Sequence, residues 1–101
     1  MEKLIITTES KKTLAKKLAK KLVKKGLAAC VMVSKNEFSA YIYEGKFYKE
    51  REWVLSIKTA QKFKKVKHFI KKNHSYELPE IIGLKIAKID KKYKKWLKGQ
   101  R

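Results

Sequence analysis

The segment NHSYELP, residues Asn73 to Pro79, gathers polar chemistry in an otherwise lysine-rich chain. It holds one of the two histidines, His74, together with Tyr76, Glu77 and the only proline. An imidazole beside a carboxylate can exchange a proton or bind a metal ion. The segment is therefore a candidate rim of a binding pocket. The alternative is a structural turn in which Pro79 sets the entry to the next strand and Tyr76 packs on the domain.

Cys30 and Met32 form a second candidate pair. They are two residues apart in an apolar run that predicts a strand, so both side chains point to one face. A thiolate and a thioether suit Cu(I), and His74 is the candidate third ligand. The alternative, which residue type favours, is that both are pliable apolar fillers of the core.

Catalytic motifs are missing from the sequence. It has no Gly-rich phosphate loop, CxxC pair, HExxH helix or GxSxG elbow. Nucleophilic catalysis would depend on Cys30 with His74, and a cysteine inside an apolar strand is normally unreactive. We therefore predict a protein that is not an enzyme.

Length and composition predict one cytoplasmic domain. A chain of 101 residues has room for a single core, so we predict one domain over residues 1–101. Its longest uncharged apolar stretch, Gly26 to Ser34, is far shorter than a membrane-spanning helix, and the start does not resemble a secretory leader. The single cysteine agrees with a reducing compartment.

The net charge of +19 comes from 28 basic and 9 acidic residues. Such an excess raises the possibility of nucleic-acid binding, because neutralising phosphates releases counterions. The only arginines, however, are Arg51 and Arg101, and arginine is the better reader of phosphates and bases. We favour a solvated, lysine-rich surface of a heat-adapted protein, and keep a polyanion partner as the alternative.

Hydrophobic spacing predicts five strand segments and three helices, the last of them at the C-terminus. The predicted strands are Leu4–Thr8, Leu27–Val33, Glu37–Tyr43 and Glu52–Thr59, with Phe47–Glu50 extending one of the last two, and a strand after Pro79 that places Ile82, Leu84 and Ile86 on one face. The predicted helices run from a Ser10 cap to a stop at Gly26, from a Thr59 cap over Ala60–Lys72, and from an Asp90 cap with Tyr93, Trp96 and Leu97 facing inward. Turns are predicted at Ser34–Asn36 and Glu44–Lys46.

This order is that of a ferredoxin-like α+β fold, the split β-α-β arrangement, with an extra C-terminal helix. Two helices on one face of an antiparallel sheet leave the other face uncovered. In so small a domain, an uncovered face that carries aromatic residues indicates a partner, and a second copy of the chain is the simplest one.

Five motifs in order, LAACVMV, SAYIYEGK, EWVLSIKT, HSYELPEII and YKKWL, resemble those of the CutA family, the divalent-cation tolerance proteins. The resemblance extends from Ile5 to Leu97. It implies a ferredoxin-like subunit of a homotrimer, related in architecture to the PII signalling proteins, whose hairpin and sheet edges pair across subunits. It also implies copper or another divalent cation as the ligand, and no organic cofactor.

The resemblance also implies roles for particular residues. Cys30 matches the family's cysteine and His74 the histidine of its turn, positions that gather in clefts between subunits; with Met32 as a further candidate, they are the candidate metal ligands. The inter-subunit cleft would contain Tyr43, Glu52, Lys58, Thr59, Tyr76 and Glu77. Three departures stand out: Ser75 replaces a usual proline and should loosen the turn, Met32 replaces a common asparagine, and Tyr43 replaces a frequent tryptophan.

These observations lead us to expect a heat-stable cytoplasmic homotrimer whose clefts bind a metal ion, copper first, or a small ligand. Two alternatives stay open. One is a basic nucleic-acid or polyanion-binding module on the same fold. The other is a PII-like sensor that binds an anionic nucleotide against Lys58, for which the sequence offers no phosphate loop.

Overall fold

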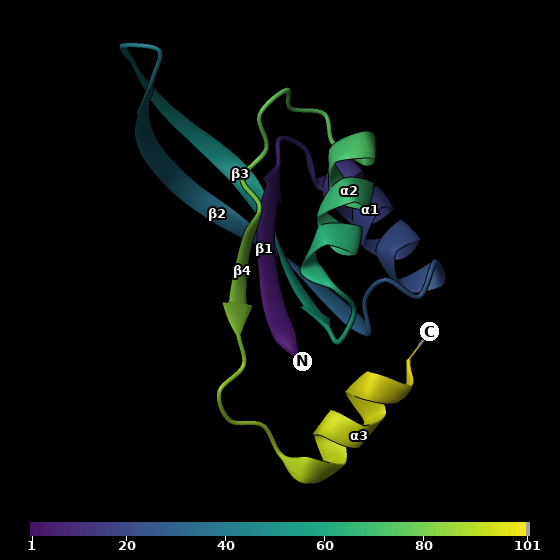
Figure 1. Ribbon diagram of the computed structural model, residues 1–101. Helices are drawn as coiled ribbons and strands as arrows, with labels where there is room; N and C mark the ends of the chain where they lie inside the picture. The colour runs from purple at the N-terminus through teal and green to yellow at the C-terminus, as the bar shows by residue number, and fades with distance from the viewer. Residues whose placement is uncertain (101) are drawn as a thin grey trace.

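Two helices cover one face of a four-stranded antiparallel sheet in the computed structural model, which describes residues 1–100 (Figure 1). Arg101, the last residue of the predicted domain, lies outside the described residues. The elements are β1 Lys3–Glu9, α1 Lys12–Lys24, β2 Cys30–Tyr43, β3 Lys46–Thr59, α2 Phe63–Asn73, β4 Ile82–Lys85 and α3 Lys91–Gly99. The strands lie in the order β2-β3-β1-β4, and every neighbouring pair is antiparallel. The predicted ferredoxin-like fold with a terminal helix is confirmed.

The core lies between the sheet and the apolar stripes of α1 and α2. Leu18 and Leu22 of α1 and Ile70 of α2 are buried against Ile5 and Ile57 of the two central strands. Residues three and four apart lie on one side of a helix, so this stripe faces the sheet and the intervening lysines face solvent. Gly26 follows α1 with a φ of 72°, a conformation that favours glycine, and confirms the predicted stop.

The predicted caps of α1 and α2 are wrong. The N-caps are Lys11 and Lys62, and neither makes a side-chain capping bond. The backbone N–H of Ser10 donates to Glu9 instead. The hydroxyl of Thr59 donates to the carbonyl of Leu27 at 2.7 Å and accepts the N–H of Gln61 at 3.0 Å, so it joins strand to loop before the helix begins.

The C-terminal helix α3 begins where predicted. The carboxylate of Asp90 accepts the N–H of Tyr93 at 3.1 Å, which satisfies a free backbone donor of the first turn. Of the three side chains predicted to face inward, only Leu97 is buried. Tyr93 is 37% exposed and Trp96 is 44% exposed.

The predicted turn at Ser34–Asn36 is wrong, because β2 continues through it to Tyr43. The strand accommodates the polar residues with a bulge between Asn36 and Ser39, where the register against β3 shifts. The predicted turn at Glu44–Lys46 is confirmed: Glu44 and Gly45 have φ values of 50° and 76°, as a two-residue hairpin loop requires.

The bulge decides which residues share a face. Asn36 pairs with Glu52, and beyond the bulge Ser39 pairs with Glu50 and Tyr41 with Tyr48. Two residues of β2 oppose one of β3 there, so the alternation of β2 is reset by one position. Tyr41 is thereby on the same face as Glu52, the face that the helices leave uncovered.

The outer part of the β2–β3 hairpin projects beyond the helices (Figure 1). We call residues 37–51 the hairpin arm. Its apolar side chains are largely exposed: Phe38 is 63%, Ile42 72% and Phe47 60% accessible. On β4, Ile82 and Leu84 are also about half exposed, and they pair with the residues of β1 that face away from the helices.

We predict that Gly83→Ala lowers the stability of the fold. A Cβ atom at Gly83 of β4 would lie 2.7 Å from Cδ1 and 2.8 Å from Cε1 of the Phe63 ring. Overpacking of this kind costs about 1–3 kcal/mol, measurable by urea unfolding at a fixed chain concentration. The control is Gly99→Ala, which has no atom within 4 Å of its added Cβ and should be neutral or stabilising. Equal stability of the two variants would contradict the prediction.

Candidate functional site

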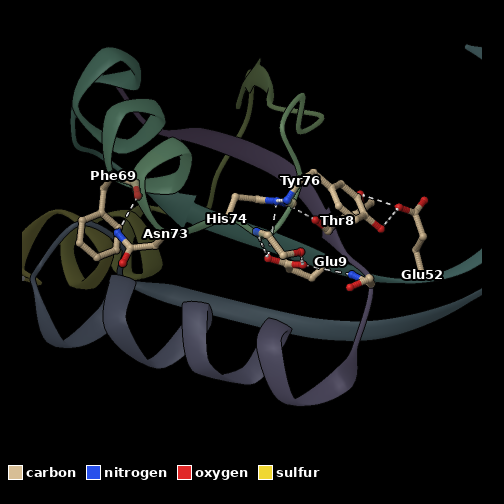
Figure 2. Close-up of polar contacts among 9 residues, drawn as sticks. Thr8, Glu9, Glu52, Phe69, Asn73, His74 and Tyr76 are labelled. Atoms are coloured by element: carbon tan, nitrogen blue, oxygen red, sulfur yellow. Dashed lines mark hydrogen bonds and ion pairs between the residues drawn. The ribbon is translucent and has the colours of Figure 1, made fainter. Parts of the chain in front are cut away.

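The segment after α2 occupies an edge of β1 that β4 leaves free. β4 pairs only with Lys3 to Ile6. Farther along, Nε2 of His74 contacts the carbonyl oxygen of Thr8, and Nδ1 accepts the N–H of Tyr76 at 2.9 Å (Figure 2). A carbonyl only accepts, so the proton is on Nε2 and the imidazole is neutral. Both ring nitrogens of this fully buried side chain are therefore occupied, and His74 serves to attach the turn to the sheet.

Glu9 fixes the same turn from the helix side of β1. Its carboxylate, in a residue only 1% exposed, accepts the N–H of Ser10 at 3.1 Å, the N–H of Ser75 at 3.0 Å and the Ser75 hydroxyl. Nδ1 of His74 lies 3.5 Å away. The N–H and O–H donors of Ser10 and Ser75 offset the hydration that this buried carboxylate has lost. Ser75, which we expected to loosen the turn, fastens it instead, through an N–H that proline lacks.

Glu52 of β3 fixes the turn from the open face. Its Oε2 accepts the hydroxyl of Tyr76 at 2.8 Å and the hydroxyl of Thr8 at 3.2 Å. Burial, together with the hydrogen bond to Glu52, raises the pKa of the Tyr76 phenol well above its ordinary value. The phenol therefore stays a neutral donor, and Oε1 of Glu52 has no donor within the described part of the chain.

A cleft of about 1000 Å³ lies between this turn and the hairpin arm. Its lining is acidic and rich in tyrosine: Tyr41, Tyr43, Tyr48, Tyr76, Glu50, Glu52, Glu77 and Glu80. Four of the nine acidic residues of the chain meet here, and none of the lysines placed by the structure lines the cleft. In a chain of net charge +19, this is a local negative surface that attracts cations.

The residues predicted for the cleft divide into two groups. Tyr43, Glu52, Tyr76 and Glu77 line it. Thr59 faces the helices and is 1% exposed. Lys58 lies near the other end of β3, where its Nζ donates to the Tyr93 hydroxyl at 3.2 Å and lies 5.4 Å from the centre of that ring.

The candidate metal ligands do not meet within one copy. Cys30 pairs with Lys58 and Met32 with Ser56, so both lie on the open face, and Met32 is 52% exposed. His74 contacts β1 at Thr8, which is level with Val54. Four residues of β3, about 13 Å, separate that level from Cys30. A Cys30–His74 pair for catalysis is likewise not formed, and within residues 1–100 no group of three or more His, Cys, Asp or Glu is arranged to hold a metal ion.

Sequence reasoning missed several residues of the site. Glu50 and Tyr41 could have been found, since each lies two positions before a predicted cleft residue in a strand and so shares its face. Nothing in the sequence marks Glu9 as the buried acceptor for Ser75, because the two are 66 positions apart.

A protein-family model described as CutA1 divalent ion tolerance protein matches residues 3–100. The chain belongs to the CutA1 family. It is 35% identical over 99 residues to the divalent-cation tolerance protein CutA of Thermus thermophilus, covering 97% of this chain and 96% of that protein. It is 36% identical over 97 residues to the chloroplastic CutA protein of Arabidopsis thaliana, covering 95% of this chain but only 53% of that protein.

Solved structures of CutA1 family members have the same fold. The Thermus thermophilus protein superposes with a TM-score of 0.93 at 35% identity, covering 99% of this chain and 98% of that one. The periplasmic CutA of Archaeoglobus fulgidus superposes with a TM-score of 0.91 at 33% identity, covering 96% and 95%. Family members are thus named for the chloroplast and the periplasm, and the cytoplasmic location stays a prediction. Within residues 1–100, no helix has the length and hydrophobicity needed to cross a bilayer.

We predict that Glu9→Gln destabilises this CutA1 family member by about 1–3 kcal/mol, because an amide oxygen replaces only one acceptor and the new NH₂ group faces the Ser75 donors. Urea unfolding measures the loss. Glu37→Gln is the matched control: its carboxylate is 71% exposed in an ion pair with Lys35, and such pairs contribute little. A loss no greater than that of the control would show that Glu9 does not hold the turn.

We predict that Tyr76 makes the stability of the fold depend on pH in the alkaline range. Its pKa is higher in the folded than in the unfolded chain, so the stabilisation it provides is complete below about pH 10 and is lost as the pH rises beyond that. In Glu52→Gln the neighbouring negative charge is gone, and Tyr76 should ionise at lower pH. The tyrosinate absorbance is followed as the pH rises. Subtracting the absorbance of the Tyr76→Phe variant leaves the ionisation of Tyr76 alone. An unchanged titration in Glu52→Gln would rule out the coupling.

Proposed function

We propose that the protein is a non-catalytic homotrimer that binds a divalent cation in the acidic cleft beside the hairpin arm, each cleft being completed by a second copy. The observation that supports this most directly is the collection of four carboxylates, without a described lysine, in a chain of net charge +19. Membership of the divalent ion tolerance family agrees with a cationic ligand. Cation tolerance would then follow from binding the ion, with no bond made or broken.

Assembly is supported by the exposed apolar surface. Phe38, Ile42 and Phe47 project from the hairpin arm, and β2 and β4 are sheet edges with free backbone donors and acceptors. Pairing of edges would satisfy these groups and bury the apolar side chains. It must also overcome the repulsion between chains of charge +19, which salt screens beyond about 8–10 Å. The number three rests on the resemblance to the family.

The donor set of the cleft fits a divalent cation. Tyr76 and Thr8 both donate to Oε2 of Glu52, so its Oε1 is free to bind a metal ion while the carboxylate is held in place. Carboxylate and phenol oxygens suit hard or borderline ions, Cu(II) included, better than Cu(I). For Cu(I), the supported ligands are Cys30 and Met32, which share the open face. His74 could join only after its ring leaves Thr8 and Tyr76.

The remaining expectations have narrower support. A cytoplasmic location is proposed from the single cysteine alone. A PII-like nucleotide sensor is less favoured, because the Lys58 ammonium that it would use already lies over the Tyr93 ring.

We predict three chains per particle in native mass spectrometry, with Cu(II) or Mn(II) bound. The Glu50→Gln, Glu52→Gln double variant should bind either ion at least tenfold more weakly, because it removes two charged ligands of the cleft. Glu37→Gln, Glu44→Gln is the control of equal charge, since neither residue lines the cleft. Single chains would overturn the assembly, and unchanged binding by the double variant would overturn the site.

The role of Cys30 is tested separately. With Cu(I) held in a competing chelator, Cys30→Ser should lower the affinity at least tenfold if the thiolate is a ligand. Binding that is unchanged in this variant would remove Cys30 from any copper site and leave the carboxylate cleft as the proposed one.

A further inference from the structure

The two helices that cover the sheet are uniformly basic on their solvent side. α1 reads KTLAKKLAKKLVK and α2 reads FKKVKHFIKKN, and neither contains an acidic residue. The carboxylates of the chain lie elsewhere: at Glu2 before β1, on the strands, the hairpin arm, the turn after α2 and the cap of α3. The outer face of α1 and α2 therefore carries lysines without any carboxylate, although lysines also occur elsewhere in the chain.

These lysines do not take part in the ion pairs of the described chain. The lysine ion pairs within residues 1–100 join Lys35 to Glu37 and Lys94 to Glu2. A heat-adapted surface gains its stability from networks of opposite charges, which α1 and α2 cannot form between themselves. Heat adaptation, our first interpretation of the lysine excess, therefore does not explain this face.

Several of these lysines are placed where they weaken the helices, although those in the last turns suit the helix dipole. In α1, Lys12, Lys16, Lys20 and Lys24 follow each other at four-residue spacing, where like charges repel by a few tenths of a kcal/mol per pair. Both helices begin among lysines, although the helix dipole favours acidic residues at this end. Neither first turn contains an acidic residue. A surface that costs local stability in this way indicates a partner that neutralises it.

We propose that the outer face of α1 and α2, the basic helical face, binds the phosphate backbone of double-stranded DNA without reading its sequence. Lysine supplies point charges to phosphates but lacks the planar fork with which arginine reads bases. A helix of 13 residues spans about 20 Å, long enough to follow several phosphates along a strand. This inference is independent of the cation site, which lies on the other side of the sheet.

Other polyanions fit this face less well. Single strands are bound by stacking bases on aromatic rings, but α1 has no aromatic residue, and Phe63 and Phe69 of α2 pack against the core. Insertion into a membrane needs a free apolar side, and the apolar stripes of both helices, at Leu18, Leu22 and Ile70, are already buried against the sheet.

The test measures the affinity of the intact protein for a labelled duplex DNA of random sequence over a range of salt concentrations. The variant carries Lys16→Gln, Lys20→Gln, Lys64→Gln and Lys71→Gln, four exposed positions on the two helices. Glutamine keeps the helix propensity, which circular dichroism checks. The control carries Lys46→Gln, Lys49→Gln, Lys85→Gln and Lys88→Gln, exposed positions outside the helices with the same loss of charge.

If the basic helical face binds DNA, the helix variant loses more than tenfold in affinity relative to the control. Its slope of log affinity against log salt also becomes shallower, by about 0.9 for each phosphate that the variant no longer neutralises. Equal loss in both variants would show attraction by net charge alone and overturn the proposal. Absence of duplex binding at moderate salt would overturn it as well, as would lysine-dependent binding to anionic lipid vesicles without binding to duplex DNA.

Discussion

The candidate site depends on the unpaired edge of β1 at Thr8 and Glu9. Because β4 stops pairing at Ile6, these last residues of β1 would leave backbone and side-chain groups without partners. Residues 74–76 supply the partners on every side: His74 to the Thr8 carbonyl, Ser75 to Glu9 below the sheet, and Tyr76 to Glu52 above it. One wall of the cleft is thus a rigid extension of the sheet, held by buried polar bonds.

The opposite wall depends on a single irregularity of backbone pairing. Without the bulge between Asn36 and Ser39, the alternation of β2 would direct Tyr41 and Tyr43 to the other face of the hairpin arm. With it, they stand across from Tyr76 and beside Glu50 and Glu52, and Tyr41 stacks on Tyr48 with ring centres 5.4 Å apart. Both walls are therefore set by where regular strand pairing stops or slips.

This origin explains what could be predicted from the sequence. Periodicity identified the strands and helices and their order, and chain alternation placed Cys30 and Met32 on one face, because these are local properties. The polar run Ser34–Asn36 looks like a turn, but β2 continues through it and forms a bulge. Pairing with β3 on both sides of the bulge stabilises the strand more than a turn would. The Glu9–Ser75 bonds join positions that no local pattern connects, and so the sequence did not indicate that the side chain of His74, the candidate ligand, is buried against β1.

The basic helical face and the acidic cleft lie on opposite sides of the sheet. The lysines of α1 and α2 lie on the side of these helices away from the sheet, so they neither line the cation site nor stand between copies that close on the sheet face. Attraction between exposed charges fades over about 8–10 Å at ordinary ionic strength, and the sheet with its core lies between the two surfaces. The acidic cleft can therefore keep its own negative potential inside a strongly basic chain, and a polyanion on the helices need not compete with a cation bound on the sheet side.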